Sequence, residues 1–247
     1  MFFETGNITR FSFRFFTEFS FRFFEGKEFL RQCFYIGNRS LTLAGITAFI
    51  MGLVITIQSR PTLVEFGAEA WLPKLASLSL IREITPVITA LICAGKVGSG
   101  IGAELGSMKV TEQIDAMEVS GTNPYRYLVV TRILATTFMI PLLVVCSDGI
   151  ALGGAWIGNN IKGQITWPLF RNQVFDSLSF GDVLPSIIKS FFFGYVIGAV
   201  GCYKGFTTFS GTEGVGQSAN SSVVISSLLI FIIDFIAVQV SDMLNLT

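Results

Sequence analysis

The sequence predicts an all-α integral membrane protein with an amino-terminal interfacial helix, five transmembrane helices and a short cytoplasmic helix. Three observations support this fold class. Hydrophobic residues make up 51% of the 247 residues and charged residues only 14%, and the mean hydropathy of +0.64 exceeds that of ordinary soluble domains. The apolar residues gather in five runs. A short polar segment, residues 111–124, separates the second run from the third.

The five apolar runs are long enough to cross a bilayer. Residues 41–58 hold no charged side chain, and a helix of that length extends about 27 Å, close to the ~30 Å hydrocarbon core. The second run carries four charged residues, whereas the last three are interrupted only by Asp148, Lys189 and Asp234. A soluble helical protein with an unusually apolar core is the disfavoured alternative. The other runs are residues 75–107, 133–161, 183–203 and 221–241.

The amino terminus is rich in phenylalanine and arginine, with twelve of the 25 phenylalanines in the first 34 residues. Arg10, Arg14, Glu18 and Arg22 lie four residues apart, which gives a polar stripe on a helix. Alternating phenylalanines also fit a strand in part, and disorder is a third alternative. The lack of turn residues between positions 7 and 25 favours a helix, and the composition suits the headgroup region. We therefore interpret residues 1–39 as an amphipathic Phe/Arg-rich interfacial segment.

The distribution of basic residues predicts the orientation. Five spans place the two termini on opposite sides of the membrane, and basic residues concentrate at cytoplasmic ends. Six basic residues precede the first span, and an internal amino terminus also places Lys109, Arg126 and Lys204 in the cytoplasm. Four basic residues then remain outside: Arg60, Lys74, Lys162 and Arg171. We expect a cytoplasmic amino terminus and an external carboxyl terminus.

The polar segment after the second span predicts a short cytoplasmic helix that binds a partner. Acidic residues recur every three positions on one side, and Gly121 and Pro124 end the helical pattern. The opposite side is apolar, with Ile114, Met117 and Val119 as candidates to cover it. A helix this short is marginal by itself, so we expect it to dock on a soluble motor. The expected contact residues are Glu112, Gln113, Ile114, Asp115, Met117 and Glu118.

Charged residues inside the predicted spans mark a candidate polar cavity. Each costs at least ~2.5–3.5 kcal/mol in hydrocarbon unless it finds a partner or water. Arg82 and Glu83 precede Pro86, which loosens a helix and would let both side chains face a cavity. Lys189 and Asp234 lie in the fourth and fifth spans. The alternatives are ion pairs that only fix helix packing, and a proton relay.

Several kinds of site are disfavoured by the composition. The formal net charge of zero gives no reason to expect a nucleic-acid partner. The four cysteines lack CxxC spacing and the chain has no histidine, so a disulfide framework or zinc site is not expected.

Residues 95–100 (GKVGSG) lack the order of a phosphate-binding loop, so any ATP must be hydrolysed by another polypeptide. The glycines in residues 95–106 and 149–158 predict close helix packing, a dimer seam or bending.

Four motifs follow one another in the central part of the chain: residues 80–86 (LIREITP), 94–98 (AGKVG), 103–108 (AELGSM) and 111–118 (TEQIDAME). Beyond them lie a glycine-rich segment, residues 211–224, and Asp234. In these motifs the sequence resembles the MlaE-type permeases, the membrane subunits of bacterial lipid-transporting ABC systems. The resemblance covers residues 40–243 in order.

The resemblance implies a permease domain over residues 40–247 that forms a homodimer around a lipid cavity. It also implies a cytoplasmic ABC ATPase, a periplasmic MCE-domain lipid-binding protein, and phospholipid as substrate. By position, the cavity charges are Arg82, Glu83, Lys189 and Asp234, and the coupling helix is about residues 111–120. Lys96 replaces a frequent arginine, and residues 218–222 (SANSS) replace a threonine-rich pattern.

From the resemblance and the residues together, we predict the permease subunit of an ABC transporter that moves phospholipids between the inner and outer membranes. It would be a multi-pass inner-membrane protein with a periplasmic carboxyl terminus and no cofactor of its own, because the partner ATPase binds ATP and Mg²⁺. The alternatives are a proton-coupled secondary transporter and a non-transporting scaffold. The secondary transporter is disfavoured because the sequence lacks an internal repeat and because it contains the docking segment.

Overall fold

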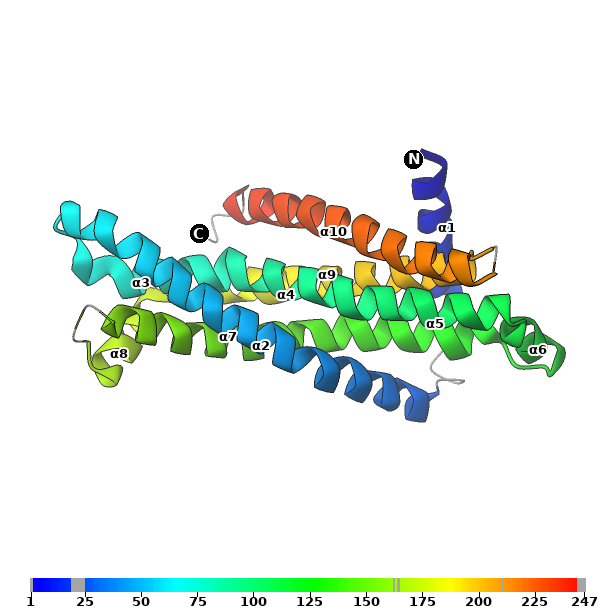
Figure 1. Cartoon of the computed structure of the whole chain (residues 1–247). Helices are drawn as coiled ribbons and strands as arrows, with labels where there is room; N and C mark the ends of the chain where they lie inside the picture. The colour runs from blue at the N-terminus through cyan, green and yellow to red at the C-terminus, as the bar shows by residue number, and fades with distance from the viewer. Residues whose placement is uncertain (1, 19–24, 162, 164, 210, 244–247) are drawn as a thin grey trace.

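The chain forms an elongated helical bundle in the computed structural model, which describes residues 2–18, 25–161, 163, 165–209 and 211–243 (Figure 1). All regular structure in these residues is helical, so the predicted all-α class is confirmed. The helices are α1 (Phe2–Glu18), α2 (Gly26–Glu65), α3 (Leu72–Ser79), α4 (Thr85–Cys93), α5 (Ser99–Val110), α6 (Gln113–Val119), α7 (Thr131–Asn160), α8 (Trp167–Ser177), α9 (Phe180–Phe206) and α10 (Gly211–Met243).

Five helical stretches in this part of the chain are long and apolar enough to cross a membrane, as predicted. They cover the five apolar runs, except for residue 161 of the third, and each begins before its run. The first begins at Gly26 and continues without a break past residue 39. The stretches are Gly26–Glu65, Glu69–Val110, Tyr125–Asn160, Phe180–Phe206 and Gly211–Met243.

The second span is built of several pieces. A 3-10 turn, Glu69–Trp71, begins it, and π-helical turns at Leu80–Ile84 and Ala94–Gly98 separate α3, α4 and α5. Pro86 has no backbone N–H to offer the carbonyl of Arg82, which accounts for the widened turn at the first π segment. The helix is therefore loosened at Arg82 and Glu83, as expected from the sequence.

The core of the bundle is centred on α7, which packs against α2, α4 and α9. The contact with α2 is close because glycines face the neighbouring backbone. A Cβ at Gly154 would clash with the carbonyl of Phe49, and one at Gly52 would clash with that of Ala151. Gly153, by contrast, has nothing within 4 Å of a Cβ. The intramolecular reading of the second glycine group is thus confirmed for Gly154.

The amino-terminal helix α1 does not run along the bundle. Figure 1 shows it crossing near the end that carries α6, while α3 and α8 lie at the opposite end. The side chain of Phe11 packs against the rings of Tyr125, Tyr203 and Phe206, while Phe13 is exposed. A helix is confirmed for Phe2–Glu18, and its place at the membrane surface stays a prediction. Residues 26–39 of the predicted interfacial segment belong instead to α2, which continues into the first span. The part of this prediction that concerns residues 19–24 lies outside the described residues.

The close contact between α2 and α7 yields a testable prediction. Replacing Gly154 by leucine forces the two backbones apart, and overpacking of this kind costs about 1–3 kcal/mol. We expect Gly154→Leu to lower the midpoint of thermal unfolding, measured by circular dichroism in detergent. Gly153→Leu is the matched control and should unfold near the wild-type temperature. Equal midpoints for the two variants would contradict this packing.

Candidate functional site

Three charged residues from three separate spans meet at one point. The ammonium of Lys189 on α9 donates hydrogen bonds to Glu83 Oε2 at 2.7 Å and to Asp234 Oδ1 at 2.8 Å. Lys189 is only 3% exposed in its side chain, whereas Glu83 is 41% exposed. The cation is therefore fully paired in the interior, and one carboxylate still reaches an open surface. The sequence predicted all three residues and left Lys189 open as a partner of Asp234, but it did not indicate that Lys189 also pairs with Glu83.

Arg82 takes a different partner from its neighbour Glu83. Its Nη1 lies 3.6 Å from Asp182 Oδ1, close enough for an ion pair but too far for a hydrogen bond. The other oxygen of Asp182 accepts hydrogen bonds from the backbone N–H and the hydroxyl of Ser179, which caps the start of α9. Asp182 was missed at the sequence level. The spacing of Ser179 and Asp182, which resembles a capping box, is the signal that could have found it.

These residues line a small cavity. Its volume is about 20 Å³, and its wall includes Arg82, Glu83, Asp182 and Lys189 together with Val238 of α10. This space holds about one water molecule. The single chain therefore presents a charged wall with exposed edges rather than an enclosed ligand pocket. Such a wall can bind and orient an anion, and it requires no covalent chemistry.

The short helix α6 lies at one end of the bundle, whereas α3, which directly precedes the π-helical turn with Arg82 and Glu83, lies at the other (Figure 1). Ile114 is buried in the core and Met117 packs against it, as predicted. Val119, which we expected on the same side, is 91% exposed. That expectation was wrong, because Val119 is the last residue of the helix, where the chain turns away. Asp115 pairs with Lys109 at 2.7 Å, and the other polar contact residues are exposed: Glu112, Gln113 and Glu118.

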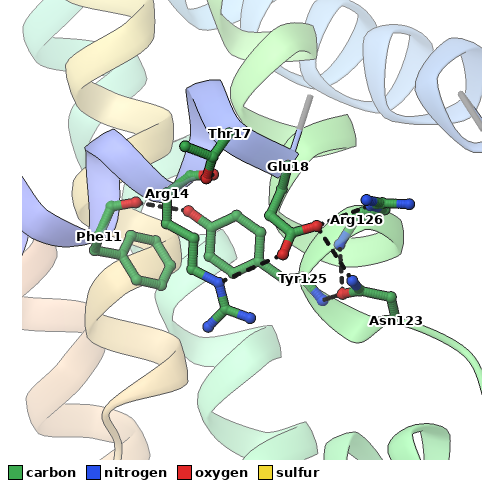
Figure 2. A network of polar contacts seen from close by, with 7 residues as sticks. All are labelled: Phe11, Arg14, Thr17, Glu18, Asn123, Tyr125 and Arg126. Carbon is green, nitrogen blue, oxygen red and sulfur yellow. Dashed lines mark hydrogen bonds and ion pairs between the residues drawn. The ribbon is translucent and has the colours of Figure 1, made fainter. Parts of the chain in front are cut away.

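A polar network ties α1 to the segment that follows α6 (Figure 2). The hydroxyl of Tyr125 donates to the Phe11 carbonyl at 2.6 Å, and the guanidinium of Arg14 lies 4.6 Å from the centre of the Tyr125 ring. Glu18 pairs with Arg126 at 2.9 Å and accepts a weaker bond from Asn123 at 3.3 Å. The exit of α6 is therefore held by α1. Sequence reasoning missed this network, because nothing in the sequence places residue 18 beside residue 126.

A second missed feature links the helices on either side of α6. Arg132 of α7 is only 2% exposed and donates to Glu104 of α5 at 2.8 Å. It also donates to the carbonyl of Leu128 at 3.1 Å. The sequence shows an arginine directly before the apolar run that begins at Ile133. It does not show that this arginine is buried, because the burial depends on packing against α5.

The Lys189 bridge yields a prediction about stability. Lys189→Met leaves two carboxylates facing each other without a cation, and removal of one partner from a buried ion pair costs about 3–5 kcal/mol. We expect a marked fall in the thermal unfolding midpoint of the purified protein. The triple variant Lys189→Met, Glu83→Gln, Asp234→Asn removes all three charges and should recover most of the loss. A triple variant no more stable than the single one would contradict the bridge.

Comparisons with known proteins show the family of the chain. A family model described as Permease MlaE matches residues 29–240. A probable ABC transporter permease protein of Synechocystis sp. is 40% identical over 206 residues, which is 83% of this chain and 78% of the relative. One from Rickettsia typhi is 36% identical over 210 residues, 85% and 81% of the two chains. The intermembrane phospholipid transport system permease protein MlaE of Haemophilus influenzae is 33% identical over 211 residues, 84% and 80% of the two chains. The chain therefore belongs to the MlaE permease family.

Proposed function

We propose that this chain is the membrane subunit of an ABC transporter that moves phospholipids between the inner and outer membranes. The observation that carries the proposal is the state of Arg82. Its side chain is one-third exposed and lines the cavity, and among the described residues its one ion pair is the 3.6 Å contact with Asp182. A guanidinium is always charged and offers paired donors that match a phosphate. A lipid phosphate can therefore replace Asp182 without breaking a hydrogen bond.

The neighbouring charges support the same reading. Lys189 is neutralised by two carboxylates, so it does not compete for the ligand. Ala237 and Val238 of α10 add apolar surface to the wall of the cavity. A polar headgroup site beside apolar side chains fits an amphipathic ligand better than a free ion.

The size of the cavity indicates that a second copy of the chain completes it. A volume of about 20 Å³ is far below the ~300–1,000 Å³ of typical ligand sites. The α10 helix supplies part of the wall and exposes large apolar side chains such as Phe231 and Phe235. A two-fold dimer would double the wall and present two α6 helices. The resemblance to the family supports this arrangement.

The remaining partners follow from the two ends of the bundle. The helix α6 is the proposed docking site of a cytoplasmic ABC ATPase, which binds the ATP and Mg²⁺. A periplasmic MCE-domain protein would exchange lipid at the end that carries α3 and α8. This arrangement places the amino terminus in the cytoplasm and the carboxyl terminus in the periplasm of an inner-membrane protein, as the basic residues predict.

Lipid capture at the cavity tests the substrate. A photoreactive side chain at Val238, which lines the cavity without bearing a charge, should form a phospholipid adduct in nanodiscs that hold the dimer. Arg82→Ala should reduce that adduct about tenfold, the effect of losing roughly 1.4 kcal/mol of binding. Arg171→Ala, an exposed arginine on α8, is the matched control and should leave it unchanged. Equal capture in the two variants would reject a phosphate site at Arg82.

Charge reversal on α6 tests the coupling role. Glu112→Lys with Asp115→Lys should weaken co-purification of the ATPase by about tenfold, because both side chains are exposed on the proposed docking face. The control, Glu65→Lys with Asp176→Lys, makes the same charge change at exposed sites near the opposite end. Normal ATPase binding by the α6 variant would refute docking there.

The mass of the intact complex with its ATPase reports the number of permease copies. One permease per particle would refute the shared cavity.

A further inference from the structure

A second cavity lies between α2 and the second span, away from the Lys189 cluster. Its volume is about 220 Å³. Lys96, which lines this cavity, is thirteen residues after Glu83 in the same span. Thirteen residues of helix extend about 20 Å. The two sites are therefore separate. The polar residues on its wall are Gln32, Tyr35, Arg39, Ser40, Lys96 and Glu104.

Two cations, Arg39 and Lys96, line this cavity, and neither pairs with a carboxylate among the residues that the structure describes. The ammonium of Lys96 donates to the backbone carbonyl of Arg39. The Arg39 guanidinium donates to the Tyr35 hydroxyl and lies 4.0 Å from the centre of that ring. In the described part of the chain, no carboxylate oxygen lies within 4.0 Å of either cationic group. Both side chains are exposed, so an external anion can reach these two cations.

The acids near the cavity are already engaged. Glu104 is directed to Arg132 at 2.8 Å. Glu28 accepts from Gln32 at 2.8 Å and pairs with Arg31 at 3.5 Å. Neutralisation from within the chain would therefore require breaking one of these contacts. A phosphate group carries the negative charge and the acceptor oxygens that a carboxylate partner of Arg39 and Lys96 would supply.

The depth of the cavity identifies the source of the phosphate as a lipid. Arg39 is two residues before the uncharged run 41–58, so it lies where the hydrocarbon region begins. Leu43, Ile46 and Ile50 follow at helical spacing on the same face and are exposed. An acyl chain can lie along this stripe while its headgroup reaches the cations.

We propose that Arg39 and Lys96 bind the phosphate of a lipid in the leaflet on the α6 side of the membrane. The ligand is a glycerophospholipid, held by the two cations and the Tyr35 hydroxyl, with its acyl chains along α2. This site is additional to the transport cavity and does not depend on the direction or occurrence of transport.

Photocrosslinking from α2 tests the proposal. The full-length protein carries a photoreactive residue at Leu43, one turn beyond Arg39, and is placed in nanodiscs of phosphatidylglycerol and phosphatidylcholine. The fraction of protein with a lipid adduct is measured by intact mass. Arg39→Gln with Lys96→Gln should lower that fraction about tenfold. The matched control, Lys27→Gln with Arg31→Gln, removes two exposed cations from the same helix and should change it less than about twofold.

Further arms separate the alternatives. Dioctanoyl phosphatidylglycerol should compete for the adduct, whereas dioctanoylglycerol, which lacks phosphate, and inorganic phosphate at the same concentration should not. Equal competition by dioctanoylglycerol would show apolar contact only, and equal competition by phosphate would show a free-anion site. Each result overturns the proposal.

The remaining variants guard against misfolding and against confusion with the transport site. Arg39→Lys with Lys96→Arg keeps both charges and should retain the adduct, and its loss would overturn the proposal. Arg82→Ala should leave the adduct at Leu43 unchanged, which separates this site from the transport cavity. A fall in the Leu43 adduct in Arg82→Ala equal to that in the glutamine variant would overturn a separate site.

Discussion

A lysine inside the membrane-spanning part of a protein must be paired, and Lys189 is held by two carboxylates from two other spans. The second, fourth and fifth spans therefore meet at one charged point. α10 packs against α5 and α9 along one side of the bundle, and much of its surface is exposed. The bridge to Asp234 is thus a specific polar tie between this last helix and the rest of the chain. The same tie fixes Glu83, and so sets Arg82 beside it at the edge of the cavity.

The second span connects this charged point to α6. It contains two π-helical turns, one at Leu80–Ile84 beside the Lys189 bridge and one at Ala94–Gly98 beside the second cavity. Turns of this kind are frequent at functional sites, because they interrupt the regular helix and redirect side chains. At the α6 end, Arg132 ties α7 to α5, and the Tyr125 network ties α1 to the segment after α6. A displacement of α6 would therefore act on α1, α5 and α7 together.

The sequence predicted what depends on local pattern and not what depends on three-dimensional neighbours. The five spans followed from the length of the apolar runs, and α6 followed from its acidic periodicity and the residues that end it. The intramembrane charges were visible because such residues are rare in apolar runs. Their pairing was predicted only in part. Lys189 was an alternative partner of Asp234, whereas its contact with Glu83, 106 positions away, was not expected. Asp182 was missed because its role depends on Arg82, which lies on another helix. Val119 was misplaced because helical periodicity ends where the helix ends.

We propose that hydrolysis of ATP by a partner drives phospholipid through the cavity beside Lys189. Reconstitution of the permease with an ABC ATPase and an MCE protein in liposomes that contain a labelled phospholipid tests this step. We expect the label to move between the membrane and the MCE protein, and this movement should require hydrolysable ATP and Mg²⁺. Movement driven by a proton gradient without ATP would indicate a secondary transporter instead. ATPase binding with no movement of lipid under any condition would indicate a scaffold, and either result would rule out the proposed function.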